Sequence, residues 1–147
     1  MTMKKARFST IIQAPKARVW AVLWDETLYG EWTRVFGEGS RAITDWQEGS
    51  EVLFVGADGG GMYSVIAKKV PNAFMSFRHL GELKDGQKQP ADATTQAWAG
   101  AEENYTLTET GGATELLVEM DVLEDHAAYF ATAFSQALQK VKELAEG

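Results

Sequence analysis

The sequence contains no cysteine and only two histidines, His79 and His126. The chain therefore has no thiolate nucleophile, no cysteine-based zinc site and no disulfide. Two histidines are also too few for an ordinary histidine-rich metal site. We expect neither a metal nor another cofactor, and we expect a fold that its apolar core stabilises alone.

Long apolar segments are missing as well. Residues 1–12 include Lys4, Lys5 and Arg7, and only short apolar stretches follow before Pro15. This is too little for the core of a secretory signal peptide, and no stretch approaches the roughly 20 apolar residues that cross a membrane. We therefore predict a cytoplasmic protein.

Basic residues are scarce relative to acidic ones. The 21 acidic and 14 basic residues give a formal net charge of -7, and the acidic residues are spread along the whole chain. A field of this sign repels phosphate backbones and anionic lipid surfaces. We expect neither nucleic acid nor a membrane among the partners.

The length and the apolar pattern predict one domain over residues 1–147, with no repeat or linker that divides it. Residues 5–13 have the composition of a strand. The Ala14-Pro15 pair opens a helix, and Asp25 can cap a second, short helix. Six further strands are predicted at residues 40–46, 51–55, 61–70, 74–80, 103–110 and 114–123.

The last two segments differ from this strand pattern. Residues 81–100 lack periodicity and contain an Asp-Gly pair and a proline, so they are predicted to form a long irregular loop that is a candidate lid. Residues 125–146 have apolar side chains at helical spacing, and Asp125 is the expected N-cap.

This order favours an α+β fold in which a curved antiparallel sheet surrounds the long C-terminal helix, in the order β-α-α-β6-α. A sheet of about seven strands twists enough to curl. The helix carries small side chains at Ala127, Ala131, Ala133 and Ala137. We expect these positions to leave room for a bound molecule.

Several short motifs are spread along nearly the whole chain. They are Ile12-Gln13-Ala14-Pro15 with Val19-Trp20, Trp46-Gln47-Glu48-Gly49-Ser50, Phe77-Arg78-His79-Leu80-Gly81, Glu103-Asn104-Tyr105-Thr106-Leu107 and Gly112-Ala113-Thr114-Glu115-Leu116. In these motifs the chain resembles the START-like, or SRPBCC, superfamily, which includes polyketide cyclases and Bet v-like proteins. Within it, the chain is most similar to the branch of the activator of heat shock protein 90 ATPase.

The resemblance implies a helix-grip fold with a cavity between the C-terminal helix and the sheet. Members of the superfamily bind lipids, hormones or polyketides, and some are cyclases, aromatases or dehydratases. The similarity to the activator also implies a chaperone as a partner. The motifs are mostly packing and turn positions, so they specify the fold better than the activity.

His79 is the main candidate for a polar group in the cavity. It shares strand parity with Met75 and Phe77, so it points to the same face as they do. A buried histidine needs a hydrogen-bond partner, which a backbone carbonyl or Tyr105 can provide. Alternatively, His79 is the polar anchor, or a general acid-base group, at the floor of a cavity. No acidic residue is spaced along the sequence so as to orient it.

The leading functional hypothesis is noncovalent binding of a small hydrophobic or amphipathic molecule. A polyketide cyclase-like or dehydratase-like enzyme and a chaperone ATPase regulator stay open as alternatives, and no residue is assigned as catalytic. The protein is expected to be a monomer or a homodimer. Among the lining residues, Trp32 and Trp98 are expected at the cavity mouth. The predicted lining comprises Trp32, Phe54, Tyr63, Phe77, His79, Trp98, Tyr105, Met120, Phe130 and Phe134.

Overall fold

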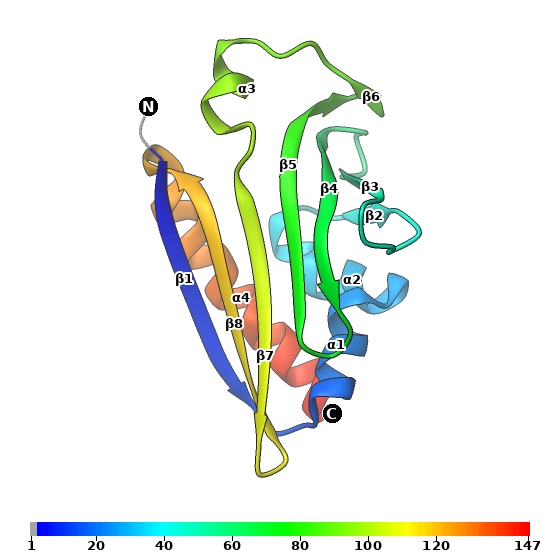
Figure 1. The fold of residues 1–147 in the computed structure, drawn as a ribbon, viewed down its shortest axis with the longest axis vertical. Helices are drawn as coiled ribbons and strands as arrows, with labels where there is room; N and C mark the ends of the chain where they lie inside the picture. Colours follow the sequence, from blue (N-terminus) through cyan, green and yellow to red (C-terminus); the bar gives the residue numbers. More distant parts are fainter. Residues whose placement is uncertain (1–2) are drawn as a thin grey trace.

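The structure, a computed structural model, describes residues 3–147 and contains one antiparallel sheet. Its strands are β1 (Met3–Ile12), β2 (Arg41–Ile43), β3 (Glu51–Val55), β4 (Gly61–Val70), β5 (Phe74–Lys84), β6 (Gln87–Lys88), β7 (Glu102–Thr110) and β8 (Ala113–Leu123). The strand order is β1-β8-β7-β5-β4-β3-β2, and the short β6 pairs with β5. The helices α1 (Lys16–Trp24), α2 (Glu26–Trp32) and α4 (Ala127–Glu146) lie on one side of this sheet (Figure 1). This is the predicted helix-grip arrangement.

The pairing of β1 with β8 joins the start of the chain to its last strand. Met3 lies opposite Leu123 and Ile12 lies opposite Thr114, so the two strands pair along their whole length. As predicted, side chains of β8 alternate between buried and more exposed positions, with Leu116 and Val118 completely buried. The buried positions form the face on which the helices pack.

Two linked helices follow β1, as the capping residues predict. Helix α1 (Lys16–Trp24) begins directly after Pro15, and α2 (Glu26–Trp32) follows without a loop and continues into a 3-10 turn (Thr33–Phe36). Asp25 accepts hydrogen bonds from the backbone N-H groups of Thr27 and Leu28, at 3.0 and 3.1 Å. The predicted cap at Asp25 is confirmed.

The C-terminal helix begins two residues later than expected. Residues Glu124–His126 form a 3-10 turn, and α4 spans Ala127–Glu146. His126 therefore occupies the cap position, where no side chain bonds to the helix, and the prediction that Asp125 is the cap is wrong. Within residues 3–147, no helix is long and apolar enough to cross a membrane.

The prediction of one long irregular loop over residues 81–100 is also wrong. Strand β5 continues to Lys84, and a two-residue turn at Asp85-Gly86 leads back into β6. Both turn residues have positive φ, 53° and 75°, which is the conformation that an Asp-Gly pair favours in a tight hairpin. A short helix, α3 (Ala93–Trp98), then lies beyond the end of the sheet (Figure 1).

The centre of the concave face is covered by side chains from the corner between α1 and α2. The ring of Trp24 makes edge contacts with Phe77 and Tyr105, at centroid distances of 5.4 and 5.0 Å, and Trp32 lies 6.3 Å from Tyr105. Of the alanines on α4 that were expected to leave space, Ala137 is completely buried. The two indole rings thus occupy space that the sequence argument left for a bound molecule.

The two aspartates at helix starts provide a matched test. D25A removes two hydrogen bonds to the N-terminus of α2 and should lower the free energy of unfolding by about 1 kcal/mol. D125A removes no cap, so its effect should stay below about 0.5 kcal/mol. Urea denaturation of both variants measures the difference, and equal losses would contradict the assigned caps.

Candidate functional site

Four polar side chains form a continuous hydrogen-bond network on the concave face. Ser64 Oγ lies 2.6 Å from His79 Nδ1, and His79 Nε2 lies 3.1 Å from Glu103 Oε1. The hydroxyl of Tyr105 donates to the other carboxylate oxygen, Glu103 Oε2. Three neighbouring strands, β4, β5 and β7, therefore contribute to one connected group.

The strand register brings these residues together. Ser64 on β4 lies directly opposite His79 on β5, because a register shift at Tyr63 and Ser64 accommodates one extra residue, Leu80, in β5. Glu103 and Tyr105 are two residues apart on β7, so they point to the same face. Because every member is on a strand, the backbone ladder holds the whole network in place.

The network is almost completely shielded from water. Ser64 has no exposed surface, and the side chains of His79 and Glu103 keep 7% and 17% of theirs. Burial alone would raise the pKa of Glu103, but the hydrogen bonds from His79 and Tyr105 and the charge of His79 outweigh it and lower that pKa below its usual value. Glu103 is therefore a carboxylate that accepts two hydrogen bonds.

The ionised Glu103 determines how His79 is oriented. Since the carboxylate carries no proton, Nε2 of His79 must be the donor between them. Nδ1 accepts from the hydroxyl of Ser64 when the imidazole is neutral and donates to that hydroxyl when the imidazole is charged. The order of Ser, His and acid resembles that of an acyl-transfer triad. However, Ser64 is wholly buried, so a substrate cannot reach its oxygen as the side chains stand.

A cluster of aromatic rings covers the network. Trp24 lies at its centre and contacts Trp46, Phe77 and Tyr105 at centroid distances of 5.0 to 5.4 Å. Phe54 extends the cluster to His79, 6.1 Å away. Burial, together with the charge of Glu103, raises the pKa of Tyr105 well above its usual value. The site is thus a small polar group enclosed by aromatic walls.

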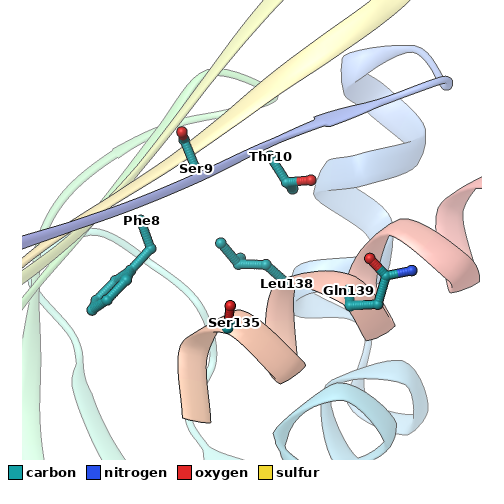
Figure 2. A pocket seen from close by; sticks show the side chains of 6 residues that line it. All are labelled: Phe8, Ser9, Thr10, Ser135, Leu138 and Gln139. Carbon is teal, nitrogen blue, oxygen red and sulfur yellow. The ribbon is translucent and has the colours of Figure 1, made fainter. Parts of the chain in front are cut away.

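One hollow, of about 330 Å³, lies between β1 and α4. Figure 2 shows Phe8 and Thr10 pointing from β1 toward α4, while Ser9 points away. Its lining consists of Phe8, Ser9, Thr10, Ser135, Leu138 and Gln139. The hollow lies between α4 and the edge strand β1, and it borders none of the ten predicted lining residues.

A second hollow, of about 240 Å³, lies between α2 and the edge strand β2. Its lining consists of Glu26, Tyr29, Arg41, Ala42, Ile43, Thr44 and Trp46. Burial and then the negative charge of Glu103 raise the pKa of Tyr29. Tyr29 lines this hollow and also packs against Trp32 and Trp46 of the aromatic cluster, whereas His79 borders neither hollow.

The structure separates the ten predicted lining residues into groups. Trp32, Phe54, Phe77, His79 and Tyr105 belong to the aromatic cluster around the network.

The remaining five predicted residues lie elsewhere. Phe130 and Phe134 form a second aromatic group on α4, and Phe134 stacks on Phe8 of β1. Met120 is buried in the core, and Tyr63 lies below the ammonium group of Lys88, at 5.0 Å. Trp98 is half-buried at the end of α3.

Trp32 does not lie at a cavity mouth, so that expectation is wrong. It keeps only 2% of its surface exposed, and its indole N-H donates to the carbonyl of Leu23 at 3.1 Å. The reason is that α2 continues directly from α1, which turns Trp32 inward against Tyr29 and Tyr105.

Sequence reasoning missed Ser64, Glu103, Trp24 and Tyr29 as members of the site. A signal for Glu103 was present, because it shares parity with Tyr105, the residue that was expected to bond to His79. The structure instead places Glu103 between the two. No comparable signal marks Ser64, whose position depends on the irregular register of β4 and β5.

The lowered pKa of Glu103 predicts how stability changes with pH. A carboxyl group whose folded pKa lies below its unfolded value of 4.5 stabilises the protein above that value, and the contribution is lost as the pH falls through the folded pKa. E103Q should therefore lower the free energy of unfolding by about 2 kcal/mol near neutral pH. The difference from the unsubstituted protein should shrink as the pH falls below 4.5 and through the folded pKa of Glu103.

Urea denaturation at a series of pH values measures this effect. E82Q, at an exposed glutamate on β5, is the matched control and should differ little from the unsubstituted protein at neutral pH. A difference between E103Q and the unsubstituted protein that does not change with pH would contradict the assigned charge.

Comparison with known proteins identifies structural neighbours only, since no protein-family model and no curated protein matches the sequence. MLL2253 from Mesorhizobium loti is 16% identical, with a TM-score of 0.75 and a match that covers 96% of each chain. CalU16 from Micromonospora echinospora is 16% identical, with a TM-score of 0.70, and the match covers 99% of this chain and 77% of CalU16.

A third neighbour, DynU16, is a protein in the dynemicin biosynthetic locus. It is 15% identical, with a TM-score of 0.69, and the match covers 95% of this chain but only 46% of DynU16. At such identities the similarity shows the fold alone. The chain has the α+β helix-grip fold that these structures share, with an antiparallel sheet and a long C-terminal helix.

Proposed function

We propose that this chain noncovalently binds a small hydrophobic or amphipathic molecule between its helices and the concave face of the sheet. The observation that carries the proposal is the network of Ser64, His79, Glu103 and Tyr105 on a face that is otherwise apolar. Binding sites for small molecules typically combine apolar walls with a few fixed polar groups.

Stability alone is a weak reason for such a network. Removing ionised groups from water costs several kcal/mol for each group, and well-packed apolar residues often serve a core equally well. A satisfied polar group in surroundings of low dielectric constant, however, interacts strongly with any polar atom that approaches it. We therefore assign His79 and Glu103 the role of a polar anchor that orients the bound molecule.

The aromatic cluster provides the apolar walls. Phe54 packs against both His79 and Phe77, Trp24 packs against Phe77, and Trp32 packs against Tyr105. Because both indole rings come from the α1-α2 corner, displacement of this corner opens the space for the ligand. All ten predicted lining residues stay in the proposal as contacts of the ligand. The centre of the proposed binding site is the aromatic cluster around His79.

The structural neighbours are compatible with this proposal. One of them, DynU16, is a protein in a biosynthetic locus, a setting in which small molecules are made. We also propose that the chain belongs to the SRPBCC superfamily and, within it, to the branch of the heat shock protein 90 ATPase activator. A cytoplasmic location and a chaperone partner stay predictions from the sequence.

A variant with an apolar network separates a functional role from a structural one. S64A/H79L/E103L/Y105F replaces all four polar groups by apolar side chains. Its free energy of unfolding should stay within about 2 kcal/mol of the original, because an apolar core needs no polar partners. Its affinity for the neutral fluorescent ketone 6-propionyl-2-naphthol, whose hydroxyl can donate to the carboxylate of Glu103, should fall roughly tenfold or more.

Fluorescence titration measures this affinity, and urea denaturation measures the stability. The control R7A/E119A removes an ion pair of 3.3 Å between β1 and β8 and should bind as the original does. Native mass spectrometry of protein purified from its source adds a search for a retained ligand. No binding of the ketone and no retained ligand would refute the proposal, and an unchanged affinity of the apolar variant would refute the anchor.

A further inference from the structure

One hydrogen-bond donor in the aromatic cluster has no acceptor. Trp24 is only 8% exposed, and no atom of residues 3–147 accepts a hydrogen bond from its Nε1. An indole N-H can only donate, and a buried donor without a partner loses the free energy of one hydrogen bond. Trp32, from the same corner, bonds to Leu23, so the missing acceptor is particular to Trp24.

The surroundings of Trp24 limit what can supply that acceptor. The rings of Trp46, Phe77 and Tyr105 lie around it, with centroids 5.0 to 5.4 Å away. Such walls favour the flat faces and edges of another aromatic ring. Tyr105 is bonded to the ionised Glu103, and the chain carries a net charge of -7, so an anionic ligand is disfavoured.

The hollow between α2 and β2 is the nearest described opening to this donor. Trp46 lines the hollow and also packs against Trp24, so one ring separates the two. The backbone of Trp46 has φ of 61°, which is uncommon for a bulky residue and costs of order 1–3 kcal/mol. Movement of Trp46 out of this conformation releases that strain. Trp46 is therefore the side chain that we expect to move aside when a ligand enters from the hollow.

The rim of the hollow carries charges of both signs. Glu26 from α2 and Arg41 from β2 both contribute to its lining, and both are exposed. Opposite charges at an entrance select for neither an anion nor a cation. The lining also includes two partly buried aromatic side chains, Tyr29 and Trp46. An uncharged aromatic molecule therefore fits the entrance as well as the interior.

Resting on the proposed function, we infer that the ligand is a flat, uncharged aromatic molecule with a carbonyl-type acceptor. It enters through the hollow between α2 and β2, passes Trp46 and accepts a hydrogen bond from Trp24 Nε1. The aromatic walls hold its ring, and the N-H of Trp24 selects its oxygen. A hydrocarbon of the same shape leaves that donor without a partner and binds more weakly.

Two probes of matched shape test the acceptor. In 2-acetylnaphthalene the side chain ends in a carbonyl oxygen, and in 2-isopropenylnaphthalene a CH₂ group replaces that oxygen. Calorimetric titration should show that the ketone binds roughly tenfold more tightly. W24F keeps an aromatic ring but lacks the N-H, so it should bind both probes equally. W20F, on the same helix, is the control and should keep the preference.

An NMR readout keeps the test valid if W24F does not fold. The sequence has five tryptophans, so Phe variants of Trp20, Trp32, Trp46 and Trp98 identify the indole signal of Trp24 by elimination. The ketone should shift this N-H proton downfield, as a new hydrogen bond does, and the hydrocarbon should not. A signal that stays in place with bound ketone would show that an ordered water or another group satisfies Trp24, and would overturn the inference.

A blocked entrance tests the route. A42W places a large ring in the hollow between α2 and β2, and stopped-flow fluorescence should show association of the ketone slowed at least roughly tenfold. The matched variant S135W fills the hollow between β1 and α4 (Figure 2) and should leave the rate unchanged. Slowing by S135W instead of A42W would overturn the route.

The outcomes distinguish this inference from the function on which it rests. Equal affinity of the unsubstituted protein for ketone and hydrocarbon would overturn the role of Trp24, while binding itself would stand. Binding of neither naphthalene, together with a retained ligand in native mass spectrometry, would overturn the ligand class alone. Only the absence of both would also remove the proposed function.

Discussion

The packing of Trp24 and Trp32 against Phe77 and Tyr105 is the interaction on which the site depends. These rings exclude water from the concave face, and the exclusion strengthens the hydrogen bonds that Glu103 receives there. Without that cover, the carboxylate and the imidazole would be solvated and their mutual attraction would be weak. The aromatic cover and the polar network therefore form one unit, and a change in either affects the other.

The backbone of the sheet sets the geometry of that unit. His79 and Ser64 meet because the register of β4 and β5 shifts at this point, and Glu103 reaches His79 from the next strand. A regular ladder would place a different residue opposite His79. The irregular pairing thus directs the side chain of Ser64 toward His79. Bulges in sheets commonly orient side chains in this way near functional sites.

The fold could be predicted from the sequence because the patterns that indicate it involve residues close together in the chain. The alternation of β8 and the cap at Asp25 depend on neighbours along the chain, and both were predictable. The inward direction of His79 followed from strand parity in the same way. The closed concave face was not predictable, because it depends on how far α1 and α2 turn Trp24 and Trp32 inward. The meeting of Ser64 with His79 likewise needs the register between two strands, which no local pattern contains.

The contacts of α4 indicate which part of the molecule can open. In the first half of the helix, Phe134 stacks on Phe8 with a centroid distance of 5.1 Å. Near its C-terminal end, Lys142 donates to the carbonyl of Ile11 and Glu146 accepts from the backbone of Gln13. These contacts join α4 to β1 and the residues that follow it, on both sides of the hollow between the two elements. A ligand that reaches the centre of the sheet must therefore displace the corner between α1 and α2, which borders the hollow at β2 and carries the rings that cover the network.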